Sequence, residues 1–147
     1  MLFRSDTTAP TFTLEQGAAQ ADPAKSSPIV FTLTGSEALA GGSVSSADFD
    51  VVNGTVSAIS CSGSACTVSV TPAGQGLVSI AAATGFSVTD VAGNAGSSVG
   101  STDAAVTYDS VAPTLTLRQA MSQPDPTTGA SIRFRLVSSE VAKPGIV

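Results

Sequence analysis

The chain of 147 residues contains no histidine and no tryptophan, one tyrosine and few basic residues. Without histidine, no Ser–His or Cys–His nucleophilic mechanism can operate within this sequence. It also has no phosphate-cradling Gly-x-x-x-x-Gly-Lys loop, and no Gly-x-Ser-x-Gly elbow precedes a helix. One tyrosine and six phenylalanines, most of them core candidates, offer few exposed platforms for carbohydrate. We therefore expect a protein that is not an enzyme.

Long apolar runs are absent as well. No stretch of about 20 apolar residues occurs, so the sequence predicts no membrane-spanning helix. Residues 1–5 do not have the apolar core of a signal peptide. We expect these five residues to be a non-native or linker leader.

Positive charge is scarce in most of the chain. The net charge is −5, and residues 6–108 contain eight acidic residues and a single base, Lys25. Because an acidic module repels phosphate backbones, this composition disfavours nucleic acid as a partner. The same charge suits solubility and is compatible with calcium.

Helical periodicity is nearly absent, and β-branched residues dominate. Short alternating runs are separated by Gly, Pro, Asn and Asp, a pattern typical of an all-β sandwich. Seven or eight strands in about 100 residues match the dimensions of an immunoglobulin-like domain. The predicted strands are 11–15, 29–36, 48–52, 55–61, 66–71, 77–83, 86–89 and 104–109.

The sequence repeats itself at an interval of 103 residues. Residues 6–37 align without a gap with residues 109–140, and 15 of the 32 aligned pairs are identical. This period indicates a tandem array. We expect one complete immunoglobulin-like domain over residues 6–108, followed at residues 109–147 by the truncated start of a second repeat.

The second copy also indicates which side chains face inward. Val30 and Thr32 are replaced by Arg133 and Arg135, whereas the apolar residues between and around them keep their type. An arginine does not lie unpaired in a core, so these positions face solvent. The alternate positions, such as Phe31, then face the core.

Two segments of the first repeat predict hairpin turns. Asn53-Gly54 is a strong hairpin signal, and we prefer this interpretation to the glycosylation sequon that Asn53 also begins. In the second segment, Cys61 and Cys66 lie on the two flanks of a short turn. Facing strand ends bring Cβ atoms within disulfide range. We favour a disulfide; free thiols or a metal pair are the alternatives, although two cysteines without histidine make a poor zinc site.

Three motifs in this order resemble the bacterial immunoglobulin-like repeats of large surface proteins and adhesins. They are Asp-x-x-Ala-Pro at residues 6–10, Phe31-x-x-x-x-Ser36-Glu37, and Thr89-Asp90-Val91-Ala92-Gly93-Asn94. The resemblance covers residues 6–147. It implies a β-sandwich, export from the cell, tandem repetition, a structural or adhesive role and, in some members, calcium at module junctions.

The topology of such a sandwich predicts two groups of calcium ligands. The chain enters at the end that carries the loops after the second and sixth strands, and it leaves at the opposite end. The first expected group is Asp6, Glu37, Asp90 and Asn94. The second, at the junction with the next repeat, is Asp22, Asp109 and Glu140. Clustered carboxylates with amide or backbone oxygens are the ligands that calcium takes.

Each of these residues also has an interpretation that needs no ion. Asp90, Gly93 and Asn94 form the pattern of an Asx-type turn, and Asp22 before a proline starts a turn. Asp6 and Asp109 cap strand ends in this interpretation. The sequence leaves both interpretations open.

The sequence therefore predicts a structural or adhesive module, a stalk or spacer of a large bacterial protein at the cell surface or outside the cell. The expected partners are neighbouring repeats of the same chain and, through other domains, a host-cell or matrix receptor. One alternative is an accessory module of a secreted multidomain hydrolase. Another is a module that binds a ligand or glycan through its own loops.

Overall fold

The computed structural model describes residues 5–141; the prediction for residues 1–4 of the leader falls outside this range. The chain divides into two compact units, Met1–Ser110 and Val111–Val147. The first unit contains β1 (Phe12–Gln16), β2 (Ile29–Gly35), β3 (Phe49–Val52), β4 (Gly54–Ser62), β5 (Ala65–Pro72), β6 (Gly76–Ala82), β7 (Val88–Thr89), β8 (Ala95–Gly96), β9 (Val99–Gly100) and β10 (Ala105–Tyr108). The second contains β11 (Leu115–Gln119) and β12 (Phe134–Ser138).

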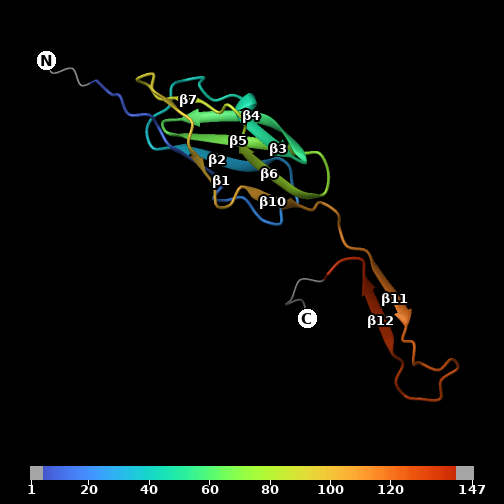
Figure 1. Cartoon of the computed structure of the whole chain (residues 1–147). Helices are drawn as coiled ribbons and strands as arrows, with labels where there is room; N and C mark the ends of the chain where they lie inside the picture. The colour runs from blue at the N-terminus through green and yellow to red at the C-terminus, as the bar shows by residue number, and fades with distance from the viewer. Residues whose placement is uncertain (1–4, 142–147) are drawn as a thin grey trace. The chain divides into compact units, whose positions relative to one another are not determined.

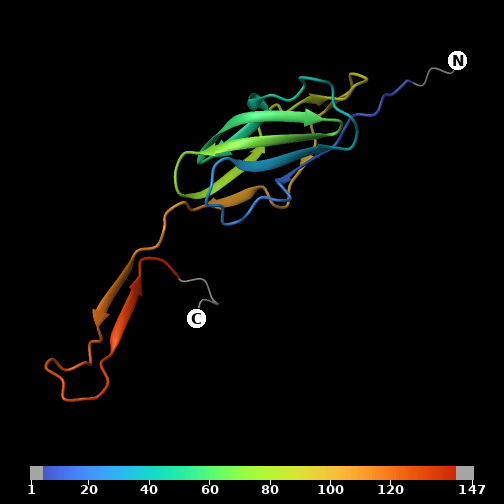
Figure 2. The same ribbon diagram turned by 180° about the vertical axis from the view of Figure 1, so that it is seen from behind.

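The first unit is a sandwich of two main sheets (Figures 1 and 2). One sheet has the strand order β4-β5-β2-β1-β9, and the other has the order β10-β6-β3. The neighbours are antiparallel except for the short parallel pair of β1 with β9. This is the immunoglobulin arrangement, in which the first, second, fourth and fifth strands share one sheet. The predicted immunoglobulin-like β-sandwich is confirmed.

The core lies between the two sheets and is built from aliphatic and phenylalanine side chains. Phe31 and Val68 of the larger sheet and Val78 and Val106 of the smaller sheet are fully buried in one cluster. Along β2, each inward side chain alternates with one that is at least partly exposed, such as Thr32. The inward facing predicted from the arginines of the second copy is therefore confirmed.

All eight predicted strands are present, with ends shifted by at most two residues. The sequence did not predict β8 and β9, which are two residues long and lie in a segment rich in Gly and Ser. A segment this short gives no alternation of polar and apolar residues to recognise. At Gly96 in β8, an added Cβ would overlap the backbone carbonyl of Pro10, so the close approach of these segments requires glycine.

The hairpin predicted at Asn53-Gly54 is wrong. Asn53 has a positive φ of 56°, as the turn signal implies, but β3 pairs with β6 while β4 pairs with β5. The chain therefore crosses from one sheet to the other at this point. The Asn53 side chain instead donates hydrogen bonds to the backbone carbonyls of Gly74, in the β5–β6 connection, and Leu77, in β6.

The second unit repeats the pairing of β1 with β2. In β11 and β12, Leu117 pairs with Leu136, and these are the residues 103 positions after the paired Leu14 and Leu33. The equivalent hydrogen bonds outside the ladder are also present, for example from the Gly17 amide to Val30 and from the Ala120 amide to Arg133. The repeat in the sequence thus corresponds to a repeat in backbone structure.

Candidate metal centre

Three connections meet at the end of the first unit where β1 begins, which we call the N-terminal pole. They are residues 5–11, the β2–β3 connection and the β6–β10 connection. A backbone bridge joins Leu39 of the second to Asp90 of the third, and the Ala40 amide donates to the Thr89 carbonyl. The side chain of Asn94 reaches the backbone carbonyl of Asp6 at 3.2 Å. The fold therefore joins three segments that are distant in the sequence.

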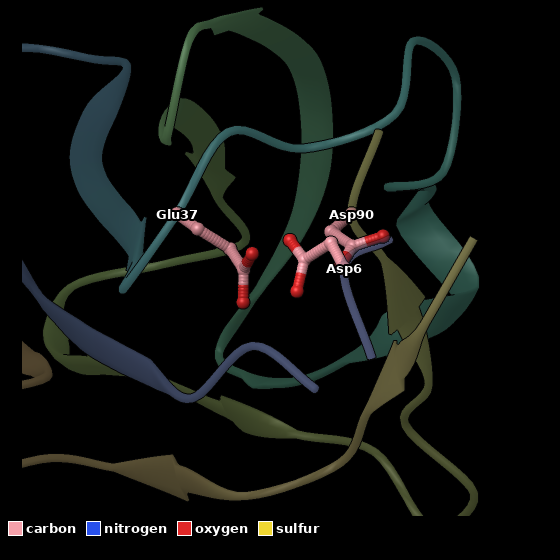
Figure 3. A group of neighbouring side chains, drawn as sticks. All are labelled: Asp6, Glu37 and Asp90. Atoms are coloured by element: carbon pink, nitrogen blue, oxygen red, sulfur yellow. The ribbon is translucent and has the colours of Figure 1, made fainter. Parts of the chain in front are cut away.

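Three carboxylates come together at this pole, each from a different connection. Asp6, Glu37 and Asp90 each offer an oxygen, and these oxygens all lie within 4.8 Å of one another. Figure 3 shows the three side chains extending toward one another from separate segments. We call this group the carboxylate cluster. Asp6 is exposed, Glu37 half-buried and Asp90 fully buried.

Asn94 completes the set of four residues that the sequence placed here. Its side-chain amide donates to Oδ2 of Asp90 at 2.8 Å as well as to the Asp6 carbonyl. The structure therefore brings together all four residues of the first predicted group. These contacts hold the four residues beside one another.

The Asp90 side chain also organises its own turn. Its Oδ1 accepts hydrogen bonds from the backbone amides of Ala92 and Asn94, each at 2.8 Å, and Gly93 supplies a positive φ of 94°. Burial raises the pKa of Asp90, but the hydrogen bonds from Asn94, Ala92 and Gly93 outweigh it and hold the pKa below its ordinary value. The Asx-type turn predicted from the sequence is thus present within the cluster.

Glu37 shows the opposite effect. Desolvation raises its pKa, and the negative charges of Asp6 and Asp90 and a hydrogen bond with Asp6 raise it further above the ordinary value of 4.5. Repulsion of this kind is relieved by a proton or by a cation. Within residues 6–108 the only basic residue is Lys25, which lies in the β1–β2 connection. The carboxylate cluster therefore favours the binding of a proton or a cation from solution.

The sequence profile described as the bacterial Ig-like domain matches residues 6–108. The chain belongs to the bacterial Ig-like domain family. Neither the curated proteins nor the solved structures include a significant match.

The bacterial Ig-like domain also contains the predicted disulfide. Cys61 and Cys66 are bonded, and they form the cross-strand pair of β4 and β5 next to the last pair before the turn, Ser62 and Ala65. Cys66 is buried in the core, and it pairs on its other side with Leu33 of β2. Domains of this family are typically not catalytic. The Gly-x-Ser-x-Gly spacing at residues 96–100 falls on β8 and β9, and the next element is the strand β10.

At the opposite end of the Ig-like domain, Asp22 lies beside the segment where the chain leaves β10. Its Oδ1 accepts a hydrogen bond from the Thr107 amide at 2.9 Å, and the Asp109 amide donates to the Ala24 carbonyl. Asp22 therefore binds the backbone of β10, 85 residues away in the sequence, and this contact is not the local turn that the sequence predicts. Glu140 belongs to the second unit. Across residues 5–141, the only group of three acidic residues is the carboxylate cluster, so a junction site of Asp22, Asp109 and Glu140 stays a prediction.

Two further polar contacts of the Ig-like domain have no signal in the sequence. The Glu15 carboxylate accepts from the amides of Thr102 and Asp103, and the Thr102 bond is the main cause of a lowered pKa at Glu15, against the opposing effect of desolvation. The Gln75 side chain both donates to the Ser110 hydroxyl and accepts from the Ser110 amide. Glu15 is 87 residues from Thr102 and 88 residues from Asp103 in the sequence. Gln75 is 35 residues from Ser110, so no local sequence pattern indicates either contact.

No helix within residues 5–141 is long and apolar enough to cross a membrane.

Proposed function

We propose that this bacterial Ig-like domain is a structural or adhesive repeat module, a stalk or spacer of a large bacterial protein at the cell surface or outside the cell. The observation that carries the proposal is the position of the two ends of the domain. The chain enters beside the carboxylate cluster and leaves from β10 at the other end of the sandwich (Figure 1). A module with this arrangement extends an array when it is repeated, as a stalk requires.

The exit from the domain is held by specific contacts. Gln75 binds Ser110 through two hydrogen bonds, and Asn53 in turn holds the connection that contains Gln75. Asp22 fixes the backbone of Thr107 one strand position before Tyr108. These contacts restrict the direction in which the chain leaves the module. A fixed exit supports the role of a spacer over that of a flexible tether.

We further propose that calcium binds at the carboxylate cluster and stiffens the start of each module. The donor set fits the ion, because calcium is held by carboxylate and carbonyl oxygens. Asp6, Glu37 and Oδ2 of Asp90 would supply carboxylate oxygens, and the Asp6 carbonyl and the Asn94 side chain lie beside them. When bound, the ion would supply the positive charge that offsets the repulsion at Glu37.

The period of 103 residues extends this proposal to the next repeat of the sequence. Asp109 and Glu140 stand 103 residues after Asp6 and Glu37, so they occupy the equivalent positions of the next module. We therefore propose that they contribute to the equivalent cluster there. Binding to a host-cell or matrix receptor would then be the task of other domains, with the repeats providing reach.

Thermal unfolding in calcium and in chelator tests the calcium proposal. Extracellular modules bind calcium with Kd values of about 0.1–1 mM, so about 10 mM calcium should raise the melting temperature by several degrees. Glu37→Gln should abolish most of this rise. Asp50→Asn removes the same charge from an exposed position of β3 and should leave it intact. An equal rise in all three proteins, or none in the wild type, would exclude calcium at the cluster.

A further inference from the structure

The Cys61–Cys66 disulfide lies at the tip of the β4–β5 hairpin, and this tip contacts the segment that carries Glu37. The turn carbonyls of Gly63 and Ser64 accept hydrogen bonds from the β2–β3 connection and from the last residue of β2. The Leu39 amide donates to Gly63 at 3.0 Å and the Gly35 amide donates to Ser64 at 2.7 Å. Glu37 is midway between these two amides in the chain.

The same segment is held on its other side by the connection that contains Asp90. The Ala40 amide donates to the Thr89 carbonyl at 2.9 Å, and the Val91 amide donates to the Ala38 carbonyl at 3.2 Å. Residues 35–40 therefore run between the hairpin tip and the Asp90 turn. The backbone position of Glu37 depends on both neighbours.

The disulfide is well placed to fix the hairpin tip. Strand β4 is at the edge of its sheet and pairs only with β5. Beyond the Cys61–Cys66 pair, only Ser62 and Ala65 extend the ladder toward the turn. Without the covalent bond, the end of an edge strand frays more readily, because few buried contacts hold it. The acceptors for Leu39 and Gly35 would then lose their fixed positions.

We propose that the Cys61–Cys66 disulfide positions Glu37 for cation binding, so that reduction of this bridge weakens calcium binding at the carboxylate cluster. This inference rests on the calcium site proposed above. In the reaction, a dithiol supplies two electrons and two protons; the sulfur–sulfur bond breaks, both cysteines become thiols, and the dithiol becomes a disulfide. The bridge acts as a positioning element and contacts no ion itself.

Calcium titration of the whole chain before and after reduction with dithiothreitol tests this inference. Unfolding is followed at each calcium concentration to obtain Kd, and free thiols are counted to verify reduction. We expect reduction to raise the Kd for calcium about 5-fold or more. A 5-fold change is about the lower end of the effect that one site usually has on the affinity of another. The double variant Cys61→Ala/Cys66→Ala should reproduce the reduced protein without any reductant.

Hydrogen exchange in the absence of metal gives a second readout. The amides of Leu39 and Gly35 should exchange faster after reduction, whereas the Ala24 amide, bonded to Thr107 at the opposite pole, should not change. An unchanged Kd in a protein whose oxidised form binds calcium would overturn the inference alone. An oxidised protein that binds no calcium would overturn the proposed calcium site, and the inference with it.

Discussion

The side-chain amide of Asn94 donates a hydrogen bond to the backbone carbonyl of Asp6, a residue 88 positions earlier in the chain. The same amide also bonds the buried carboxylate of Asp90. The Asn94 side chain thus connects the start of the module to the turn that contains Asp90.

Replacing Asn94 with alanine should destabilise the module. The substitution removes the donor to Asp90 Oδ2 and to the Asp6 carbonyl, and leaves a buried carboxylate with fewer partners. We expect the melting temperature to fall by about 4–8 °C, the range for a loss near 1 kcal/mol in a domain of this size. Differential scanning calorimetry measures the change. Asn94→Asp should lower the melting temperature more without calcium than with it, because the substitution adds a fourth negative charge to the carboxylate cluster.

Glu37→Gln should stabilise the protein when no metal is present. The raised pKa of Glu37 means that the folded state binds its proton more tightly than the unfolded state. Its contribution to stability is therefore greatest below the unfolded value near 4.5 and declines as pH rises through the folded pKa. In chelator, the variant should melt higher than wild type at pH 7, and the difference should vanish at low pH. A lower melting temperature at pH 7 would contradict this.

Acid should weaken the contacts of Glu15. Its lowered pKa means that its stabilising effect is present above the unfolded value near 4.5 and is lost as pH falls through the folded pKa. Glu15→Gln should therefore reduce stability at pH 7 and have little effect in strong acid, the reverse of the pattern for Glu37→Gln. Urea unfolding at several pH values compares the two variants directly.

Gly96→Ala should be among the most harmful small substitutions. The new Cβ would overlap the backbone carbonyl of Pro10. Because the overlapping atom belongs to the backbone, it cannot move aside as the end of a flexible side chain can. Overpacking of this kind costs about 1–3 kcal/mol. Gly41→Ala is the matched control, because a Cβ there meets nothing within 4 Å. Equal free energies of unfolding for the two variants would show that the β8 segment is not tightly held.

The strands β11 and β12 should exchange amide protons far faster than β1 and β2. Phe134 is 62% exposed whereas its equivalent Phe31 is 0% exposed, although the strand register is the same. A two-stranded hairpin without a packed face is marginally stable in water. Mass-spectrometric hydrogen exchange should resolve the two hairpins. Equal protection would mean that the apolar face of β11 and β12 is covered in solution.

The sequence predicted much of this fold because its strong signals are local or repeated. Alternation placed the eight strands, and Arg133 and Arg135 in the second copy identified the face of β2 that points away from the core. The Cys61–Cys66 bridge followed from a short turn between two strands. The positions of Asp6, Glu37 and Asp90 followed from topology, since the connections of an immunoglobulin sandwich meet at fixed ends.

Features that depend on the backbone or on distant partners could not be predicted. The Asn53-Gly54 pattern correctly indicates a positive φ at Asn53. It does not indicate that β3 pairs with β6 and β4 with β5, so the prediction of a hairpin between them is wrong. Glycine is required at position 96 because the backbone carbonyl of Pro10 lies against it. Gln75 matters because its side chain bonds the distant Ser110. None of these contacts leaves a periodic pattern in the sequence.

Solution scattering from chains of two, three and four tandem copies of residues 6–108 measures whether the repeats form a stiff stalk. A stalk stiffened by calcium predicts that the maximum dimension grows by equal steps with each copy in calcium, and by smaller, unequal steps in chelator. Glu37→Gln in every copy should remove the effect of calcium. If the maximum dimension instead grows as the square root of copy number, alike in calcium and in chelator, the repeats form a flexible chain and not a stalk.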